Sequence, residues 1–257
     1  TVGEIDVTQD RSGVQRQIGY LPENAPLYNE MLVQEYLLMM AELRGVPPDE
    51  CAAAVAEAAR ATALQTHLVQ PISSLSKGYR QRVGIAQAIV HSPDVLVLDE
   101  PTNGLDPTQI QVIRELITRL GKNTTIILST HILQEIEAVC HRVIIMIQGQ
   151  IEADAPLNEM LASDVIRMVV KADTDDEVSN RVRSIEGVRK LTRIGTTNGY
   201  TEWTFEAEKN ADPIPESVKV GASAGWSFRG VGREHRTLET VFKQLQADHV
   251  NRQGVAA

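Results

Sequence analysis

The run Val95-Leu96-Val97-Leu98-Asp99-Glu100 constrains the fold more than any other part of the sequence. Its four apolar residues in succession are typical of a short strand that is buried on both faces of a parallel sheet. Similar runs lie at residues 125–128 and 143–147, and apolar residues at helical spacing occupy residues 113–120, after a helix-start signal at Asp106. Strand, helix and strand in this order predict a βαβ unit and an α/β fold with a parallel sheet.

Two carboxylates, Asp99 and Glu100, come directly after the first predicted strand. Ligands of parallel α/β sheets bind at the carboxyl ends of the strands. In phosphoryl-transfer sites, an aspartate at this place binds Mg²⁺, and a second carboxylate beyond it can act as general base for the attacking water. An Asp-Glu pair alone more often marks a solvated turn after a strand, so the prediction depends on further features of the sequence.

A candidate phosphate site lies upstream, at Ser76-Lys77-Gly78, before an apolar helical pattern at residues 83–90. Ser76 offers a hydroxyl, Gly78 leaves the backbone N–H groups unhindered, and the helix dipole adds partial positive charge. This combination suits a γ-phosphate. An ordinary helix cap is the alternative interpretation.

Three more polar residues follow predicted strands or turns. Glu23 comes after an apolar run at residues 18–21, and its carboxylate is an oxygen ligand. Asp106 projects from a tight turn, and His131 follows the strand at residues 125–129. Because the carboxyl ends of parallel strands share one edge of the sheet, we expect His131 to reach the same crevice as Glu100. A single histidine is also compatible with a purely structural role.

In this order and spacing, the features over residues 1–160 resemble those of the ATP-binding subunits of ABC transporters. The motifs that carry the resemblance are the Q-loop position at Glu23, the signature motif at residues 75–79, the Walker B strand with its catalytic glutamate at residues 95–100, the D-loop at residues 104–106 and the switch histidine at His131. The segments at residues 18–28 and 75–89 are more similar to gliding-motility and sodium- or multidrug-export proteins than to nutrient importers. The resemblance implies an ABC-type P-loop NTPase core with ATP and Mg²⁺ as cofactors.

The resemblance also implies a role for each matched residue. Glu100 orients or deprotonates the attacking water, and His131 senses the γ-phosphate. Asp99 and Glu23 bind Mg²⁺. The residues implied to bind nucleotide are Ser76, Lys77, Gly78, Glu23 and Asp106. Asp106 also couples the two nucleotide sites of a dimer. Glu23 stands where the family usually has glutamine; since either side chain offers an oxygen, we expect the difference to be tolerated.

The implied partners are a second ATP-binding subunit, identical or different, and a separate membrane permease, which is an exporter if the branch resemblance holds. Residues 24–70 correspond to the region that docks on the permease. We expect a cytoplasmic protein, peripheral on the inner face of the cell membrane, because no run of 18 apolar residues is present. The formal charge of −9 argues against a nucleic acid partner. The alternative, a soluble ABC ATPase acting on ribosomes or DNA, would carry a second cassette or a coiled-coil insertion, and neither is visible.

One family motif, the Walker A loop G-x-x-x-x-G-K-[ST], is missing; the one Gly-Lys pair, Gly121-Lys122, does not fit it. This loop holds the β- and γ-phosphates. We therefore expect a fragment without its N-terminal strand, loop and helix, in which residues 1–5 continue a strand. Such a fragment would be inactive alone and would expose apolar surface and a strand edge. The alternative is a degenerate, non-hydrolysing subunit that lends only its signature motif to a partner.

The charge distribution predicts a second domain, over residues 161–257. Residues 1–160 carry 11 basic and 20 acidic side chains, whereas residues 161–257 carry 14 of each. Predicted strands at residues 166–170, 188–193, 201–206 and 226–231 alternate with helices at residues 175–185 and 212–219, and a closing helix follows at residues 237–246. This pattern resembles a small α+β domain of the ferredoxin kind. Regulation, dimerisation and simple bracing of the first domain all remain open as its role.

Overall fold

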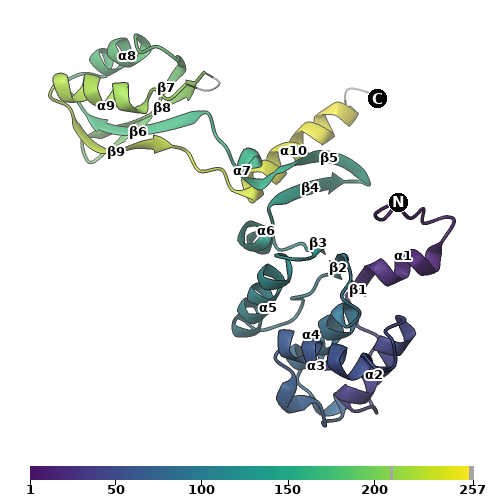
Figure 1. Cartoon of the computed structure of the whole chain (residues 1–257). Coiled ribbons are helices and arrows are strands. Elements are labelled where there is room, and N and C mark those ends of the chain that lie inside the picture. The colour runs from purple at the N-terminus through teal and green to yellow at the C-terminus, as the bar shows by residue number, and fades with distance from the viewer. Residues whose placement is uncertain (209–210, 255–257) are drawn as a thin grey trace. The chain divides into compact units, whose positions relative to one another are not determined.

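The chain forms two compact units in a computed structural model that describes residues 1–208 and 211–254 (Figure 1). The first unit is Thr1–Cys140 and the second is His141–Ala257. Each unit has its own sheet and its own buried apolar residues.

A three-stranded parallel sheet lies at the centre of the first unit, in the order β1-β2-β3. The strands are β1 (Ile18–Leu21), β2 (Val95–Asp99) and β3 (Thr125–Ser129). The helices are α1 (Arg11–Gln17), α2 (Val33–Leu43), α3 (Cys51–Ala61), α4 (Lys77–Ile89), α5 (Pro107–Leu120) and α6 (Leu133–Val139), with 3₁₀ turns at Gln65–His67 and Ile72–Ser74. The predicted βαβ unit is therefore confirmed as β2-α5-β3.

The register of the sheet brings the polar residues after the strands to one edge. Leu98 pairs with Leu21 on one side and with Leu128 on the other, and Asp99 pairs with Ser129. Because all three strands run in the same direction, the segments that follow them leave the sheet at the same end. This edge carries the candidate site.

The buried side chains of the sheet lie mainly on one face in the described part of the chain. They pack against α4 and α5, in a cluster that includes Leu21, Leu96, Leu98, Ile85 and Ile113. On the other face, the side chains of Tyr20 and Ile127 are 45% and 56% exposed. The prediction of strands buried on both faces is therefore wrong for these residues, and their apolar runs alternate between a buried and an open side.

A second apolar cluster joins α2, α3 and α4 in the first unit. Its fully buried members include Leu37, Ala59, Ile72 and Val83. Residues 24–70 therefore contain two helices, α2 and α3, that pack on α4. Residues 1–5, predicted to continue a strand, instead form a turn in which Val2 and Ile5 exchange backbone hydrogen bonds of 3.0 and 3.1 Å.

The second unit has the predicted ferredoxin-like order of strands and helices. Its antiparallel sheet has the order β7-β8-β6-β9. The elements are β6 (Val165–Lys171), α8 (Asp175–Arg183), β7 (Val188–Thr197), β8 (Tyr200–Ala207), α9 (Ile214–Ser223) and β9 (Ser227–Arg233). The first and third strands of this βαββαβ unit pair at the centre of the sheet, which is the ferredoxin-like arrangement.

A hairpin precedes this sheet and belongs to the second unit. Strand β4 (Arg142–Ile147) pairs antiparallel with β5 (Gln150–Pro156), and a short helix, α7 (Leu157–Met160), follows. The closing helix α10 (Leu238–Gly254) is tied to the hairpin because His249 Nδ1 and Glu152 Oε1 lie 2.6 Å apart. The unit therefore begins at His141 and not near residue 160, and the apolar run at residues 143–147 is a hairpin strand, not a strand of the parallel sheet.

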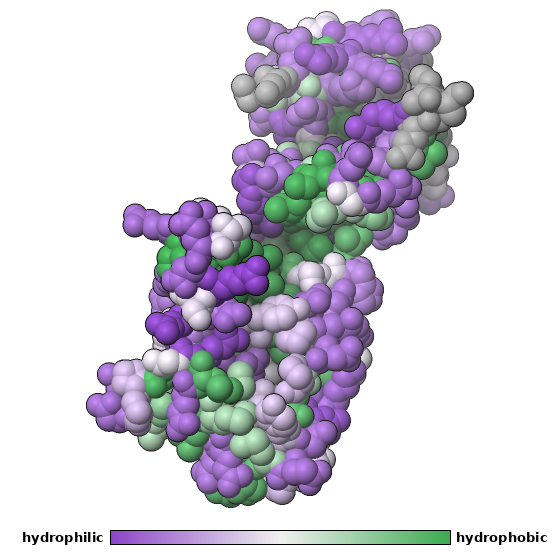
Figure 2. All heavy atoms as spheres, turned by 90° about the vertical axis from the view of Figure 1, so that its right-hand side faces the viewer, coloured by the Kyte–Doolittle hydropathy of each residue, from purple (hydrophilic) through white to green (hydrophobic). Residues whose placement is uncertain are grey.

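Apolar side chains also reach the surface of the second unit. Ile144, Met146 and Ile151 of the hairpin are 55%, 60% and 64% exposed. The surface view of Figure 2 shows apolar patches on a mostly hydrophilic exterior. Among the helices of the described residues, none has the length and apolar content needed to cross a membrane.

Candidate functional site

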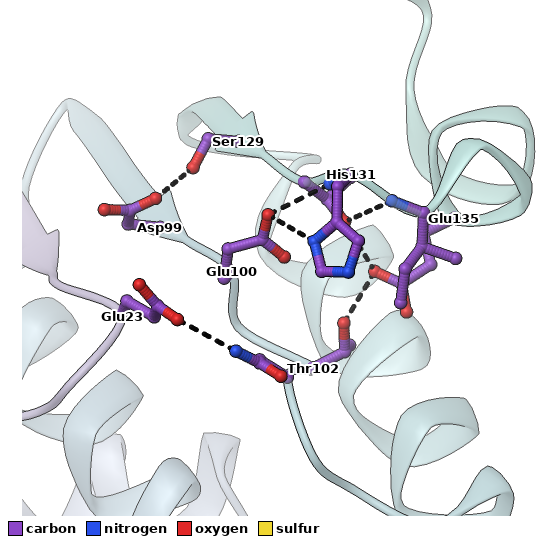
Figure 3. Close-up of polar contacts among 10 residues, drawn as sticks. Glu23, Asp99, Glu100, Thr102, Ser129, His131 and Glu135 are labelled. Carbon is purple, nitrogen blue, oxygen red and sulfur yellow. Dashed lines mark hydrogen bonds and ion pairs between the residues drawn. The ribbon is translucent and has the colours of Figure 1, made fainter.

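Glu100 and His131 meet at the carboxyl end of the parallel sheet (Figure 3). Glu100 follows β2 with a φ of +46°, and its N–H donates to the carbonyl of Ser129 over 3.0 Å. One carboxylate oxygen, Oε1, accepts the backbone N–H of His131 at 3.0 Å and lies 2.8 Å from His131 Nδ1. This hydrogen bond, with the negative charge of Glu100, raises the pKa of His131. The structure thus brings together the two residues that the sequence predicts as catalytic.

The second oxygen of Glu100 has a different environment. Oε2 is buried and has no hydrogen-bond partner among the described residues. A buried acceptor without a partner is costly, so its presence in a native site calls for a reason. An acceptor fixed through its other oxygen is suited to orienting a water molecule and receiving its proton.

Asp99 and Glu23 lie beside this pair, at the ends of β2 and β1 (Figure 3). Asp99 accepts a hydrogen bond from the Ser129 hydroxyl, and Glu23 Oε1 accepts one from Asn103 Nδ2 at 2.9 Å. The described residues contain no group of three or more His, Cys, Asp or Glu side chains that could hold a metal. Mg²⁺ is commonly held by one or two carboxylates together with phosphates and water, so the oxygen donors of Asp99 and Glu23 fit this ion.

The N-terminus of α4 carries the predicted phosphate-binding residues. Ser76 is its N-cap, and the side-chain oxygen accepts the N–H of Tyr79 at 3.4 Å. The interpretation as a helix cap is therefore correct, while the O–H of Ser76 can still act as a donor. A Cβ on Gly78 would lie 2.7 Å from Gln109 Oε1 of α5, so glycine permits close approach of the two helices.

The turn that contains Asp106 is in contact with the start of α4. Asp106 is the N-cap of α5, and its Oδ1 accepts the N–H of Gln109 at 3.0 Å. A Cβ on Gly104 would lie 2.0 Å from Lys77 Nζ, so the lysine side chain lies across the turn. The predicted residues therefore form two groups: Glu23, Asp99, Glu100 and His131 at the strand ends, and Ser76, Lys77, Gly78 and Asp106 at two helix N-termini.

Sequence reasoning missed a buried carboxyl group next to the first of these groups. The Glu135 side chain of α6 is 2% exposed, and its Oε2 accepts hydrogen bonds from Thr102 at 2.6 Å and Thr130 at 3.4 Å. The sequence held one signal for Glu135. The apolar residues Ile132 and Ile136 mark the buried face of the helix, and Glu135 lies on that same face.

Comparison with known proteins identifies the family of this chain. A family model described as ABC transporter matches residues 1–103. The Nod factor export ATP-binding protein I of Paraburkholderia xenovorans is 32% identical over 231 residues, which are 90% of this chain and 74% of that protein. The chain belongs to the ABC transporter family of ATP-binding proteins. Nucleotide binding and ATP hydrolysis are general properties of this family, as the resemblance in the sequence implied.

Other members of the ABC transporter family match a smaller share. The bacitracin transport ATP-binding protein BcrA of Bacillus licheniformis is 35% identical over 167 residues, 62% of this chain and 54% of that protein. The chain thus spans about half the length of some of its curated relatives. A solved structure of CbiO1 from Clostridium perfringens, part of the ABC transporter complex CbiONQ, has a TM-score of 0.53 and 30% identity, over 57% of this chain and 60% of that chain. This likeness confirms the ABC-type α/β fold.

Proposed function

We propose that this chain is an ATP-binding and ATP-hydrolysing subunit that powers a separate membrane permease. The observation that supports hydrolysis most directly is the carboxyl group of Glu100. One of its oxygens is fixed by the ring and the backbone of His131, and the other is buried without a partner. This arrangement suits a general base that orients and deprotonates a water molecule, and His131 beside it would contact the γ-phosphate.

We propose Asp99 and Glu23 as the residues that hold Mg²⁺. A bound Mg²⁺ neutralises negative charge on the β- and γ-phosphates. The role of the protein is to present two carboxylates at adjacent strand ends and to orient each with a hydrogen bond, from Ser129 to Asp99 and from Asn103 to Glu23.

We further propose that two such subunits bind ATP between them. The first turn of α4 would contact the γ-phosphate of ATP held by the partner, through the Ser76 hydroxyl and the N–H groups at Lys77 and Gly78. Asp106 would couple the two sites, since its turn lies against Lys77. Because the 257 residues contain no G-x-x-x-x-G-K-[ST] loop, we propose that they do not hydrolyse ATP alone.

Export is the proposed direction of transport. Two relatives, the Nod factor export protein and the bacitracin transport protein, have names that point to the removal of a compound from the cell or to its transport. The proposed location is the cytoplasmic face of the cell membrane, with residues 24–70 in contact with the permease. The cargo would be selected by the permease, not by this subunit.

The test uses the native protein, purified from its source cells with its partners, and compares wild type with Glu100→Gln. The intact mass, compared with the 28.3 kDa of the 257 residues, shows first whether the native protein includes more sequence. Removal of a general base lowers turnover about 10²–10⁴-fold, so we expect the variant to bind ATP and dimerise but to hydrolyse it at least 100 times more slowly. Glu137→Gln on α6 is the control, because it removes the same charge from an exposed position.

Each other outcome contradicts part of the proposal. Unchanged turnover in Glu100→Gln would exclude Glu100 as the base. A wild-type protein that binds no ATP would indicate a degenerate partner subunit. Co-sedimentation with ribosomes or DNA, in place of co-purification with a polytopic membrane protein, would favour the soluble ABC ATPase.

A further inference from the structure

The carboxyl group of Glu135 is buried at a place where a charge is costly. The side chain is 2% exposed, and the nearest cationic atom, Arg114 Nη2, lies 4.0 Å from Oε1. That distance is too long for a hydrogen bond, and Oε1 has no hydrogen-bond partner among the described residues. An apolar side chain at this position would hold α6 against α5 without the desolvation penalty. Packing alone therefore does not explain a glutamate here.

The close partners of Glu135 are two hydroxyl groups, one from each loop that carries a predicted catalytic residue (Figure 3). Thr102 lies two positions after Glu100 and donates to Oε2 at 2.6 Å; it is itself 2% exposed. Thr130 directly precedes His131 and donates to the same oxygen at 3.4 Å. One carboxylate oxygen thus joins two loops that are far apart in the sequence.

A second link keeps the His131 loop in place. The Thr130 oxygen accepts the backbone N–H of Ile132 at 3.1 Å, so the hydroxyl that contacts Glu135 also fixes the backbone around His131. Glu100 needs comparable support, because its φ of +46° is unfavourable for a residue with a side chain. The hydrogen bond from Thr102 to the buried carboxylate stabilises the chain just after this strained position.

We propose that Glu135 is a positioning residue for ATP hydrolysis, which holds the loops of Glu100 and His131 at the 2.8 Å separation of the two side chains. The inference rests on the proposed function, since it assigns Glu135 a part in the same reaction. Glu135 acts through Thr102 and Thr130 and does not itself contact the nucleotide. Misplacement of a general base lowers the rate of the chemical step more than it lowers substrate binding.

The experiment measures steady-state ATP hydrolysis by the native protein with two substitutions of different severity. Glu135→Leu removes both acceptors, and we expect kcat to fall about 10- to 100-fold, as for the loss of other supporting hydrogen bonds, with the KM for ATP within about twofold of wild type. Glu135→Gln keeps an amide oxygen that can accept the Thr102 hydroxyl, so it should restore most of the lost kcat. Glu137→Gln on the same helix is the matched control and should keep wild-type kinetics.

A double-mutant cycle with Thr102→Val tests whether the effect passes through the hydroxyl. If Glu135 acts through Thr102, the two substitutions together should lower kcat little more than Glu135→Leu alone. Additive effects, or equal losses in the Gln and Leu variants, would overturn the proposal. Thr102→Val has nearly the same shape as the wild-type residue, so it provides a test even if Glu135→Leu fails to fold.

The stoichiometry of ATP binding, measured beside kcat, separates positioning from simple unfolding. A fall in kcat that only follows a fall in the number of ATP-binding sites would assign Glu135 to stability and contradict the inference. Glu100→Gln is run in parallel. If it abolishes turnover while Glu135→Leu does not, only the positioning role fails; if Glu100→Gln leaves turnover unchanged, the proposed function itself fails.

Discussion

Gly19 offers a quantitative test of how β1 packs on α4. A Cβ at this position would lie 2.0 Å from the carbonyl oxygen of Ala88 and 3.0 Å from Leu96 Cδ1. Because the nearer obstacle is backbone, no change of rotamer relieves it, and in Gly19→Ala the strand and helix must separate by about 1 Å or more. A gap of that size forfeits up to about half of the dispersion attraction between facing atoms. Overpacked core sites cost about 1–3 kcal/mol, and we expect a loss of about 3 kcal/mol.

The two units can be followed separately during unfolding in urea. The two tryptophans of the chain, Trp203 and Trp226, are both buried in the second unit, so their fluorescence follows that unit. Far-UV circular dichroism follows both units. With m-values of about 1–3 kcal/mol/M, Gly19→Ala should lower the midpoint of the first unit by about 1–3 M, seen in circular dichroism, and leave the fluorescence transition in place.

A matched glycine is available in the second unit. A Cβ on Gly232 of β9 would meet no atom within 4 Å. Gly232→Ala should therefore raise the free energy of unfolding of the second unit by no more than about 1 kcal/mol, with a correspondingly small rise in its midpoint. The reasoning is refuted if Gly19→Ala unfolds with the wild-type midpoint or if the two substitutions shift their units equally. A joint shift of both signals would show instead that the two units unfold together.

Three further predictions concern titration and packing. The hydrogen bond with Glu100 raises the pKa of His131. The stabilisation from this pair is therefore complete at a pH below the pKa of histidine in the unfolded chain, and it is lost as the pH rises through the pKa of His131 in the folded chain. An NMR titration of the imidazole that shows no upward shift of this pKa would contradict the pairing. Burial raises the pKa of Tyr36 to about 12, so stability should fall as the pH rises from 10 toward 12, and absorbance at alkaline pH should show one of the five tyrosines ionising last. Leu98→Ala, at a side chain with 0% exposure, should cost about 2–5 kcal/mol by urea unfolding, and a loss below 1 kcal/mol would argue against the core as described.

The local elements of both units followed from the sequence because their signals are local. Apolar residues at helical spacing and the Asp106 cap predicted α5, and the alternation of strands and helices predicted the ferredoxin-like order of the second unit. The same holds for the strand ends: once β2 and β3 are parallel neighbours, Glu100 and His131 must leave the sheet at one edge.

Local sequence signals did not predict which strands pair with each other. An apolar run is compatible with a strand of a parallel sheet and with a strand of a hairpin. Residues 143–147 form a hairpin strand because β5, which follows directly in the sequence, is their antiparallel partner. The boundary near residue 160 failed for the same reason: α10 reaches back to the hairpin through His249 and Glu152, residues that are distant in sequence. The prediction that residues 1–5 continue a strand was also wrong, since these residues form a turn.

The order and spacing of the carboxylates, glycine and histidine were enough to identify the ABC family and to predict the chemistry of the candidate site. How those groups are supported depends on the packing of the folded chain. Thr102, Thr130 and Glu135 carry no motif, and an acidic residue in a helix is most often exposed. Only the packing of α6 against the strand ends puts the Glu135 carboxylate within 2.6 Å of the Thr102 hydroxyl, because such a contact depends on the path of the whole chain between them.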